Sequence, residues 1–176
     1  MPVTPDDTAL AALLPGTWRV GATNISRWLG GERLHPRFHY ELRSSDPLVF
    51  EDEVRYTTGS GVEKRIRGVD RLRARASGAD ESGPRGFRPH EFVWRGRGLR
   101  TLASRRFSVA GATEGSTIVV LRFSASLRTP AGVAVVVRDG TDSHAFRTEV
   151  AGLSESLGLT PGEFASLTWL ELSDSD

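Results

Sequence analysis

The chain has 176 residues and a formal net charge of only +1, with 38% hydrophobic and 26% charged residues. This is the size and composition of one globular domain that can bury a sizeable core. The near-zero charge argues against a dedicated nucleic-acid-binding protein, because such proteins neutralise phosphates with a strong basic surplus. The absence of cysteine excludes disulfides, thiolate catalysis and cysteine-based zinc sites.

The chain reads as a single domain over residues 1–176. We expect an N-terminal helix in 1–16, a strand-rich region in 17–138 and C-terminal helices in 142–176. No long apolar run and no signal-like segment follows Met1, so we expect a cytoplasmic protein with no membrane partner.

The first element is a short amphipathic helix. Thr4 is a good N-cap, Pro5 suits the first helical position, and two aspartates follow in the first turn. Leu10, Leu13 and Leu14 then form one apolar stripe, and a Pro-Gly pair ends the helix.

From Trp18 to Arg138 the dominant period is two, which predicts β-strands. Short turns rich in Gly, Pro, Ser and Asp separate the runs, and the longest loop covers 74–89. The eight predicted strands lie near 17–21, 37–43, 48–57, 63–73, 91–98, 105–110, 116–124 and 132–138.

Helical spacing returns near the C-terminus. Apolar residues from Phe146 to Leu157 follow at i, i+4, i+7 and i+11, which predicts one helix. Thr160 and Glu163 form a capping box that opens a last short helix, predicted to run through Leu170.

The third and fourth strands reveal which face points inward. In "LVFEDEVRYT" and "EKRIRGVDRLR" most odd positions carry charge, so the even positions face the core. A three-residue loop over 59–61 gives a hairpin in which the numbers of paired residues sum to 120. In that register the even-numbered residues of both strands lie on one face. Asp52 then lies opposite Gly68, Phe50 lies opposite Asp70, and the two aspartates become diagonal neighbours.

Two carboxyls inside a largely apolar barrel cannot both be ionised without a large free-energy cost. One should have a raised pKa, which makes Asp52 and Asp70 candidate catalytic residues, as a general acid or as a donor to a ligand carbonyl. The alternative is a purely structural network in which an inward Arg122 or backbone amides satisfy both acids.

Several aromatic side chains are expected to face the same interior, where Gly68 and Gly96 leave space. They are candidate ligand contacts, although each also suits simple core packing. These residues are Tyr40, Tyr56, Phe92, Trp94 and Phe107, and Trp28 joins them from the segment after the first strand.

Eight sequential antiparallel strands with short turns predict a mainly β fold, a closed antiparallel up-and-down β-barrel of about eight strands with an N-terminal helix and C-terminal helices. A sandwich of two sheets is the main alternative. The helix followed by Gly16-Thr17-Trp18 and eight strands resembles the calycin group, which comprises lipocalins, fatty-acid-binding proteins and nitrobindin-like barrels.

This resemblance implies that Trp18 packs across the closed end of the barrel, under an arginine from the last strands. Arg138 and Arg122 are the candidates for that arginine. An ordinary core tryptophan is the alternative for Trp18. The resemblance also implies a lid over the open mouth in the segment after the first strand, where Asn24, Trp28 and the glycines 30–31 lie.

Three functions remain open. The first is binding of an apolar, aromatic or polycyclic small molecule in the barrel. The second is an enzyme similar to the lipocalin-like cyclases or isomerases of bacterial secondary metabolism, which shape and protonate their substrates. The third is an interaction module that uses the alternating arginines, although these also suit a solvated outer face.

No cofactor or metal is expected. The histidines lie in separate segments without metal-ligand spacing, and no phosphate loop or nucleophile elbow is present. The expected partner is a hydrophobic small molecule, with neither nucleic acid nor membrane, and the protein is expected to be a monomer or a homodimer.

Overall fold

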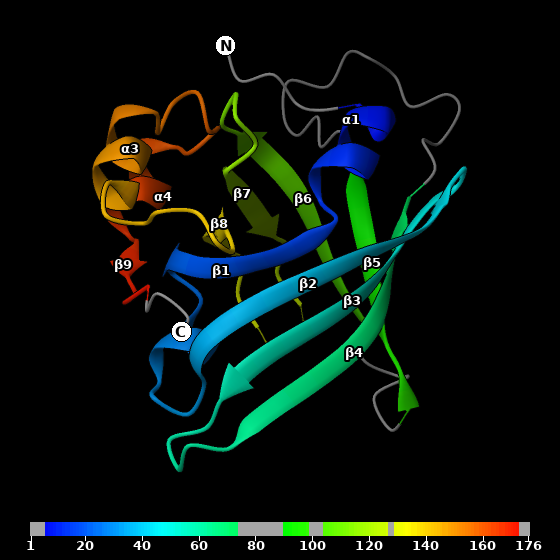
Figure 1. Cartoon of the computed structure of the whole chain (residues 1–176), viewed down its shortest axis with the longest axis horizontal. Coiled ribbons are helices and arrows are strands. Elements are labelled where there is room, and N and C mark those ends of the chain that lie inside the picture. Colours follow the sequence, from blue (N-terminus) through cyan, green and yellow to red (C-terminus); the bar gives the residue numbers. More distant parts are fainter. Residues whose placement is uncertain (1–5, 74–89, 99–103, 127–128, 173–176) are drawn as a thin grey trace.

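The computed structural model describes residues 6–73, 90–98, 104–126 and 129–172. Eight antiparallel strands follow one another around a closed barrel, because β1 pairs with both β2 and β8 (Figure 1). This confirms the up-and-down barrel and excludes the sandwich. The strands are β1 (Gly16–Thr23), β2 (Leu34–Ser45), β3 (Leu48–Thr57), β4 (Glu63–Leu72), β5 (Glu91–Gly96), β6 (Ser104–Ala112), β7 (Ile118–Phe123) and β8 (Gly132–Arg138). The loop predicted over 74–89 lies outside the described residues.

The predicted register of the β3–β4 hairpin is confirmed. Asp52 is the partner of Gly68, and Phe50 is the partner of Asp70. The even-numbered Phe50, Asp52 and Asp70 are buried, so the inner face carries both aspartates. The register of one hairpin therefore positions the polar part of the interior.

The N-terminal helix α1 (Asp7–Leu13) begins later than the sequence pattern predicts. Asp6 is the N-cap, and its Oδ1 accepts a hydrogen bond from the Ala9 amide at 2.8 Å. The predicted cap Thr4 and the following Pro5 lie outside the described residues. Asp6 replaces Thr4 as the cap because its carboxylate reaches the free amide three residues later.

The helix α1 lies across one end of the barrel (Figure 1), and its buried leucines share one apolar cluster with Trp18. Trp18 is fully buried, and its Nε1 donates to the Leu14 carbonyl at 2.8 Å. The Arg138 guanidinium carbon lies 4.2 Å from the centre of the Trp18 ring. Arg138 also donates to the carbonyls of Leu13 and Pro15, at 2.8 and 3.0 Å. Arg138 thus joins the last strand to the end of α1 over the indole.

Arg122 does not take part in this closure, so that alternative was wrong. On β7 the odd positions such as Leu121 face inward, which turns Arg122 to the outside. Its Nε lies 2.7 Å from Glu163 Oε1, and its Nη2 donates to the Gly158 carbonyl at 2.7 Å. Arg122 therefore holds the C-terminal segment against the barrel and neutralises neither interior aspartate.

The C-terminal segment packs on the outer face of β1, β7 and β8 (Figure 1). It contains α3 (Phe146–Gly152), α4 (Pro161–Ala165) and a two-residue strand, β9 (Thr168–Trp169). A second apolar core lies beneath it. Its buried members are Ala22, Ile118, Val120, Val133, Val135, Val137, Phe146, Val150, Leu157 and Leu159.

Both C-terminal helices are shorter than predicted, although the capping box of Thr160 and Glu163 is confirmed. The first of these helices ends at Gly152, where the C-cap Leu153 leaves the helical region with a φ of −111°, and the left-handed Gly158 lies in the turns that follow. The last predicted turn of helix is instead β9, which pairs with Ala22 and Thr23 of β1. That stretch of β1 lies beyond its pairing with β2, so β9 covers an otherwise open strand edge.

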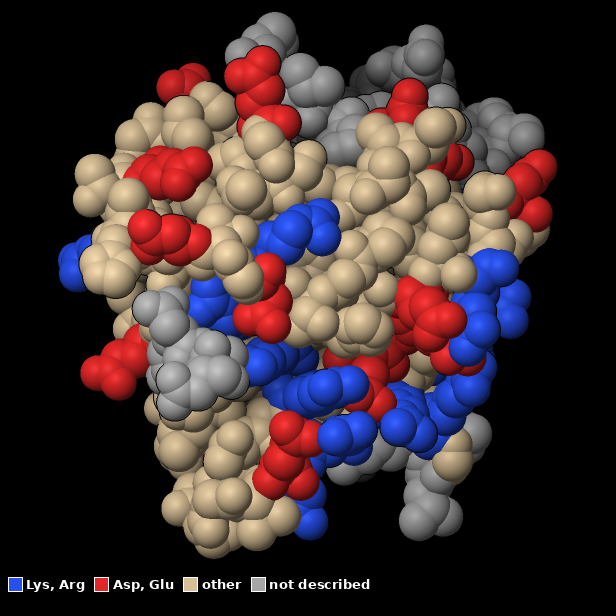
Figure 2. Space-filling view, in the orientation of Figure 1, with Lys and Arg blue, Asp and Glu red and all other residues tan. Residues whose placement is uncertain are grey.

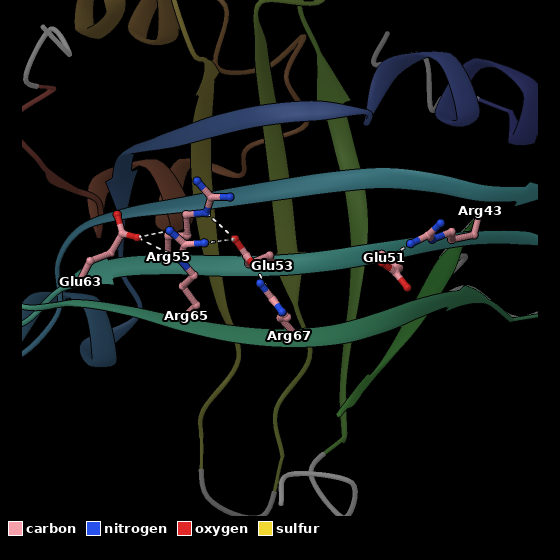
Figure 3. Close-up of polar contacts among 7 residues, drawn as sticks. All are labelled: Arg43, Glu51, Glu53, Arg55, Glu63, Arg65 and Arg67. Carbon is pink, nitrogen blue, oxygen red and sulfur yellow. Dashed lines mark hydrogen bonds and ion pairs between the residues drawn. The ribbon is translucent and has the colours of Figure 1, made fainter. Parts of the chain in front are cut away.

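Acidic and basic side chains alternate over the outer face of β2, β3 and β4 (Figure 2). Glu53 contacts Arg55 and lies 2.6 Å from Arg67 Nε, and Glu51 contacts Arg43 (Figure 3). Glutamates therefore compensate these arginines, as expected for a solvated face. Pairs of this kind at a solvated surface contribute little to stability.

Candidate functional site in the barrel interior

A chain of aromatic rings lines the barrel. The ring centres of Phe92 and Phe107 are 5.1 Å apart in a stacked pair. Phe50 lies 5.8 Å from Phe92, and Tyr40 lies 6.3 Å from Phe50. Tyr40, Phe92 and Phe107 thus face the interior as the sequence pattern predicts, and they pack on one another.

Asp52 and Asp70 lie among these rings and are 7% and 0% exposed. Strand pairing places Asp52 between Tyr40 and Gly68, and Asp70 between Phe50 and Trp94. Neither oxygen of Asp70, nor Oδ1 of Asp52, has a hydrogen-bond partner among the residues that the structure describes. Such groups are rare in native proteins, because each unpaired buried polar atom is destabilising by about 1 to 3 kcal/mol.

Trp94 lies over Gly68 beside this pair. A Cβ added to Gly68 would lie 2.1 Å from Trp94 Nε1, so the indole occupies the space that a side chain would fill. The half-buried Trp94 makes no hydrogen bond of regular geometry through Nε1 among the described residues, although the indole lies close enough to Asp52 to lower the pKa of that carboxyl. Within the described part of the chain, the two oxygens of Asp70 and Oδ1 of Asp52 therefore lie unpaired beside a poorly aligned donor.

Burial sets the protonation of the pair. Desolvation raises the pKa of Asp52 to about 7, against smaller opposing effects of the Arg105 charge and the Trp94 indole. Desolvation and then the negative charge of Asp52 raise the pKa of Asp70 well above its usual range. Burial and the same two carboxyls also raise the pKa of Tyr40. Near neutral pH the pair therefore retains a proton, so it can both donate and accept.

Arg105 is an interior residue that the sequence analysis missed. It is half-buried, and its guanidinium carbon lies 5.7 Å from the centre of the Phe123 ring. Burial lowers its pKa, and the charges of Arg27 and Arg33 act in the same direction. The sequence pattern could have predicted this inward position. Arg105 lies two residues before the inward Phe107, and alternate residues of a strand lie on the same face.

The other end of the barrel is covered by α2 (Ser26–Leu29), which lies between β1 and β2. Trp28 of α2 is 4% exposed, and its ring centre lies 6.1 Å from Phe38 and 6.2 Å from Tyr56. The predicted ligand contacts Trp28 and Tyr56 therefore meet at the mouth. Asn24 is an anchor for this segment, because its Oδ1 accepts from the Val133 amide at 2.8 Å.

Two hollows lie at this end. One of about 10 Å³ is lined by Ile25, Arg105, Phe123, Ser124, Ser126, Thr129 and Pro130. A wider one of about 460 Å³ is lined by Gly31, Glu32, Arg33, Tyr56, Thr58, Gly59, Ser60 and Lys64. Neither is lined by Asp52, Asp70 or Trp94, so an enclosed cavity around those residues stays a prediction.

Among residues 6–73, 90–98, 104–126 and 129–172, no three His, Asp or Glu side chains are placed to hold a metal ion. None of the helices in that part of the chain has the length and apolar character needed to cross a bilayer.

No protein-family model matches the sequence, and no curated protein matches it. Solved structures do. Lobster apocrustacyanin A1 is similar with a TM-score of 0.56 and 10% identity, over 94% of this chain and 84% of that one. The amine-binding protein of Rhodnius prolixus, in its tryptamine complex, gives 0.57 and 14%, over 96% and 84%. The siderocalin Ex-FABP gives 0.55 and 13%, over 91% and 95%.

These likenesses establish the fold. The chain is a lipocalin-like, calycin-type barrel with eight strands, a short N-terminal helix and C-terminal helices. Barrels of eight strands are just wide enough to be filled by side chains or to hold one small ligand.

Proposed function

We propose that this protein binds a small aromatic molecule inside the barrel, with a polar edge of the ligand on Asp52 and Asp70. The observation that supports this most is the pair of buried carboxyls, since neither oxygen of Asp70, nor Oδ1 of Asp52, has a hydrogen bond of regular geometry within the described part of the chain. A ligand that hydrogen-bonds to them would remove a desolvation penalty that the protein alone carries.

The protonation state of the two carboxyls determines which polar groups the edge of the ligand should carry. The pair retains a proton, so one of its carboxyls donates to a ligand carbonyl or hydroxyl oxygen. Asp52 accepts from a ligand N–H or O–H when it is ionised, and Trp94 Nε1 supplies a second donor. The surrounding rings favour a flat aromatic body. The Rhodnius protein of the same fold was solved with tryptamine, which is aromatic and carries N–H groups.

Binding can be tested with N-phenyl-1-naphthylamine, a neutral aromatic dye that has one N–H group and fluoresces in apolar surroundings. We expect saturable binding to the wild type, with quenching of tryptophan fluorescence. Asp52→Asn and Asp70→Asn should each change the dissociation constant by about three- to tenfold, as for one hydrogen bond of about 0.5 to 1.5 kcal/mol.

The matched control is Asp142→Asn, because Asp142 is exposed and lies outside the barrel. It should bind the dye like the wild type. Native mass spectrometry of protein purified from its own host should also reveal a retained aromatic compound. Absence of both dye binding and any retained compound would contradict the proposal.

A second candidate is catalysis at the same pair, as in a cyclase or isomerase that shapes and protonates its substrate. The observation in its favour is the pKa of Asp52 near 7, since a general acid works best when its pKa is close to the working pH. The retained compound, incubated with the wild type, should then be converted to an isomer. Asp52→Asn should lower that rate by about 100-fold or more without loss of binding. Conversion at an equal rate by the variant would exclude this role.

A further inference from the structure

The wider hollow lies beside the mouth, between the β3–β4 hairpin and the turn after α2. The two segments are close, since a Cβ added to Gly59 of the hairpin would lie 3.5 Å from the Gly31 carbonyl oxygen. The hairpin is ordered by hydroxyls, because Thr58 Oγ1 lies 2.9 Å from Ser60 Oγ and accepts from the Val62 amide at 3.1 Å. The hollow thus has one wall of hydroxyl groups.

Arg33 also lines the hollow. Its guanidinium carbon lies 4.9 Å from the centre of the Tyr56 ring and 5.8 Å from that of Trp28. Contact with two rings holds the guanidinium beside the hollow, where its donors can meet an anion. Its Nη1 is buried, and none of the described residues accepts a hydrogen bond from it.

The charge of the hollow is positive. Among the described residues that line it, Arg33 and Lys64 carry positive charge, and Glu32 carries the negative charge. Arg27 and Arg105 add positive charge nearby: burial lowers the pKa of Arg105, and the charges of Arg27 and Arg33 act in the same direction. Because Arg33 is half-buried and lines the hollow, an anionic oxygen group there would offset this positive charge.

Tyr56 connects the hollow with the barrel, because it lines the former and packs against the interior core. We propose that the ligand is an aromatic acid: its ring enters the barrel, and its anionic oxygen group binds in the hollow on Arg33 and Lys64. This rests on the proposed function, because the ring must occupy the interior for the anionic group to lie at the mouth.

The test compares two dyes with the same rings. 8-Anilinonaphthalene-1-sulfonate is N-phenyl-1-naphthylamine with an added sulfonate. The difference in affinity between the two dyes therefore reports the contribution of the anionic group. We expect the wild type to bind the sulfonate dye about tenfold more tightly than the neutral dye. Arg33→Met, which keeps an apolar stem over the rings, should abolish this advantage and leave the affinity for the neutral dye within about twofold.

The matched control is Arg43→Met, because Arg43 is an exposed arginine paired with Glu51 on the outer face. It should retain the full advantage of the sulfonate dye. Lys64 is the only lysine of the chain, so acetylation of lysine can be followed at one residue by peptide mass spectrometry. The sulfonate dye should slow acetylation of Lys64 severalfold, and the neutral dye should not.

The outcomes separate the two proposals. Failure of both dyes to bind would overturn the proposed function and this inference with it. Equal affinity for the two dyes, or an unprotected Lys64, would overturn the anionic site and leave binding in the barrel intact. An equal loss of sulfonate binding in Arg33→Met and Arg43→Met would show diffuse surface attraction and would also overturn the site.

Discussion

The buried carboxyl pair predicts that the protein loses stability as the pH rises. In the unfolded chain Asp52 has its ordinary pKa of 3.8, and in the folded barrel that pKa is about 7. Between these values the folded state holds a proton that the unfolded state has released, so the free energy of unfolding falls with increasing pH. Asp70 acts in the same direction, because its pKa is raised as well.

The magnitude follows from these two pKa values. A tenfold change in proton affinity is worth about 1.36 kcal/mol, so a pKa of about 7 in place of 3.8 corresponds to a loss of about 4 kcal/mol once Asp52 is fully ionised. About 2.5 kcal/mol of this falls between about pH 5 and about pH 8. Asp52→Asn cannot ionise there, so its stability should depend on pH less steeply by this amount.

The assay is urea unfolding followed by tryptophan fluorescence, at several pH values from about 5 to about 8, where changes in the midpoint report changes in stability. Asp142→Asn is the control, because interactions with His144 lower the pKa of Asp142, which therefore titrates below this range. A wild type that is as stable at the upper pH as at the lower one would refute the reasoning. So would an Asp52→Asn variant with the pH dependence of the wild type.

Three further predictions concern packing. Trp18→Ala should lower the free energy of unfolding by about 3 to 5 kcal/mol, because it empties the closed end; a loss below about 1 kcal/mol in urea melts would show that the indole is not core. Gly68→Ala should destabilise by about 1 to 3 kcal/mol and shift tryptophan emission, since the new Cβ would overlap the Trp94 ring, whereas Gly59→Ala should leave the emission unchanged. Arg122→Met should cost about 1 to 3 kcal/mol and speed proteolysis within the C-terminal segment, and unchanged cleavage there would argue against its anchoring role.

Local sequence pattern was sufficient to predict the barrel and the inward positions of the two aspartates of the site. Alternation of charge along β3 and β4, with the short loop between them, is enough to bring Asp52 and Asp70 to one face, because a hairpin register depends on few residues. Thr160 and Glu163 marked a helix start for the same reason, since a capping box is a contact within four residues. The closed-end position of Trp18 came instead from the resemblance of Gly16-Thr17-Trp18 after a helix to the calycin group.

The surroundings of the aspartates depend on contacts that no local pattern encodes. Trp94 meets Asp70 through the pairing of β4 with β5, across the long segment between them, and Arg105 comes from the strand beyond. Arg122 turned outward because the inward parity of β7 is odd, whereas that of β3 is even, and each strand's parity follows from its own turns and bulges.

The hollow at the mouth required the closed barrel. Arg33 and Lys64 lie in different segments, and they face one opening because β2, β3 and β4 are adjacent strands and the α2 turn folds beside the hairpin. The sequence by itself determined strand periodicity, the register of one hairpin and the interior position of two acids, all of which follow from short-range sterics and alternation. Tertiary structure alone decided which groups surround those acids and which cations converge at the mouth, because closure of the barrel sets the distances between residues far apart in the chain.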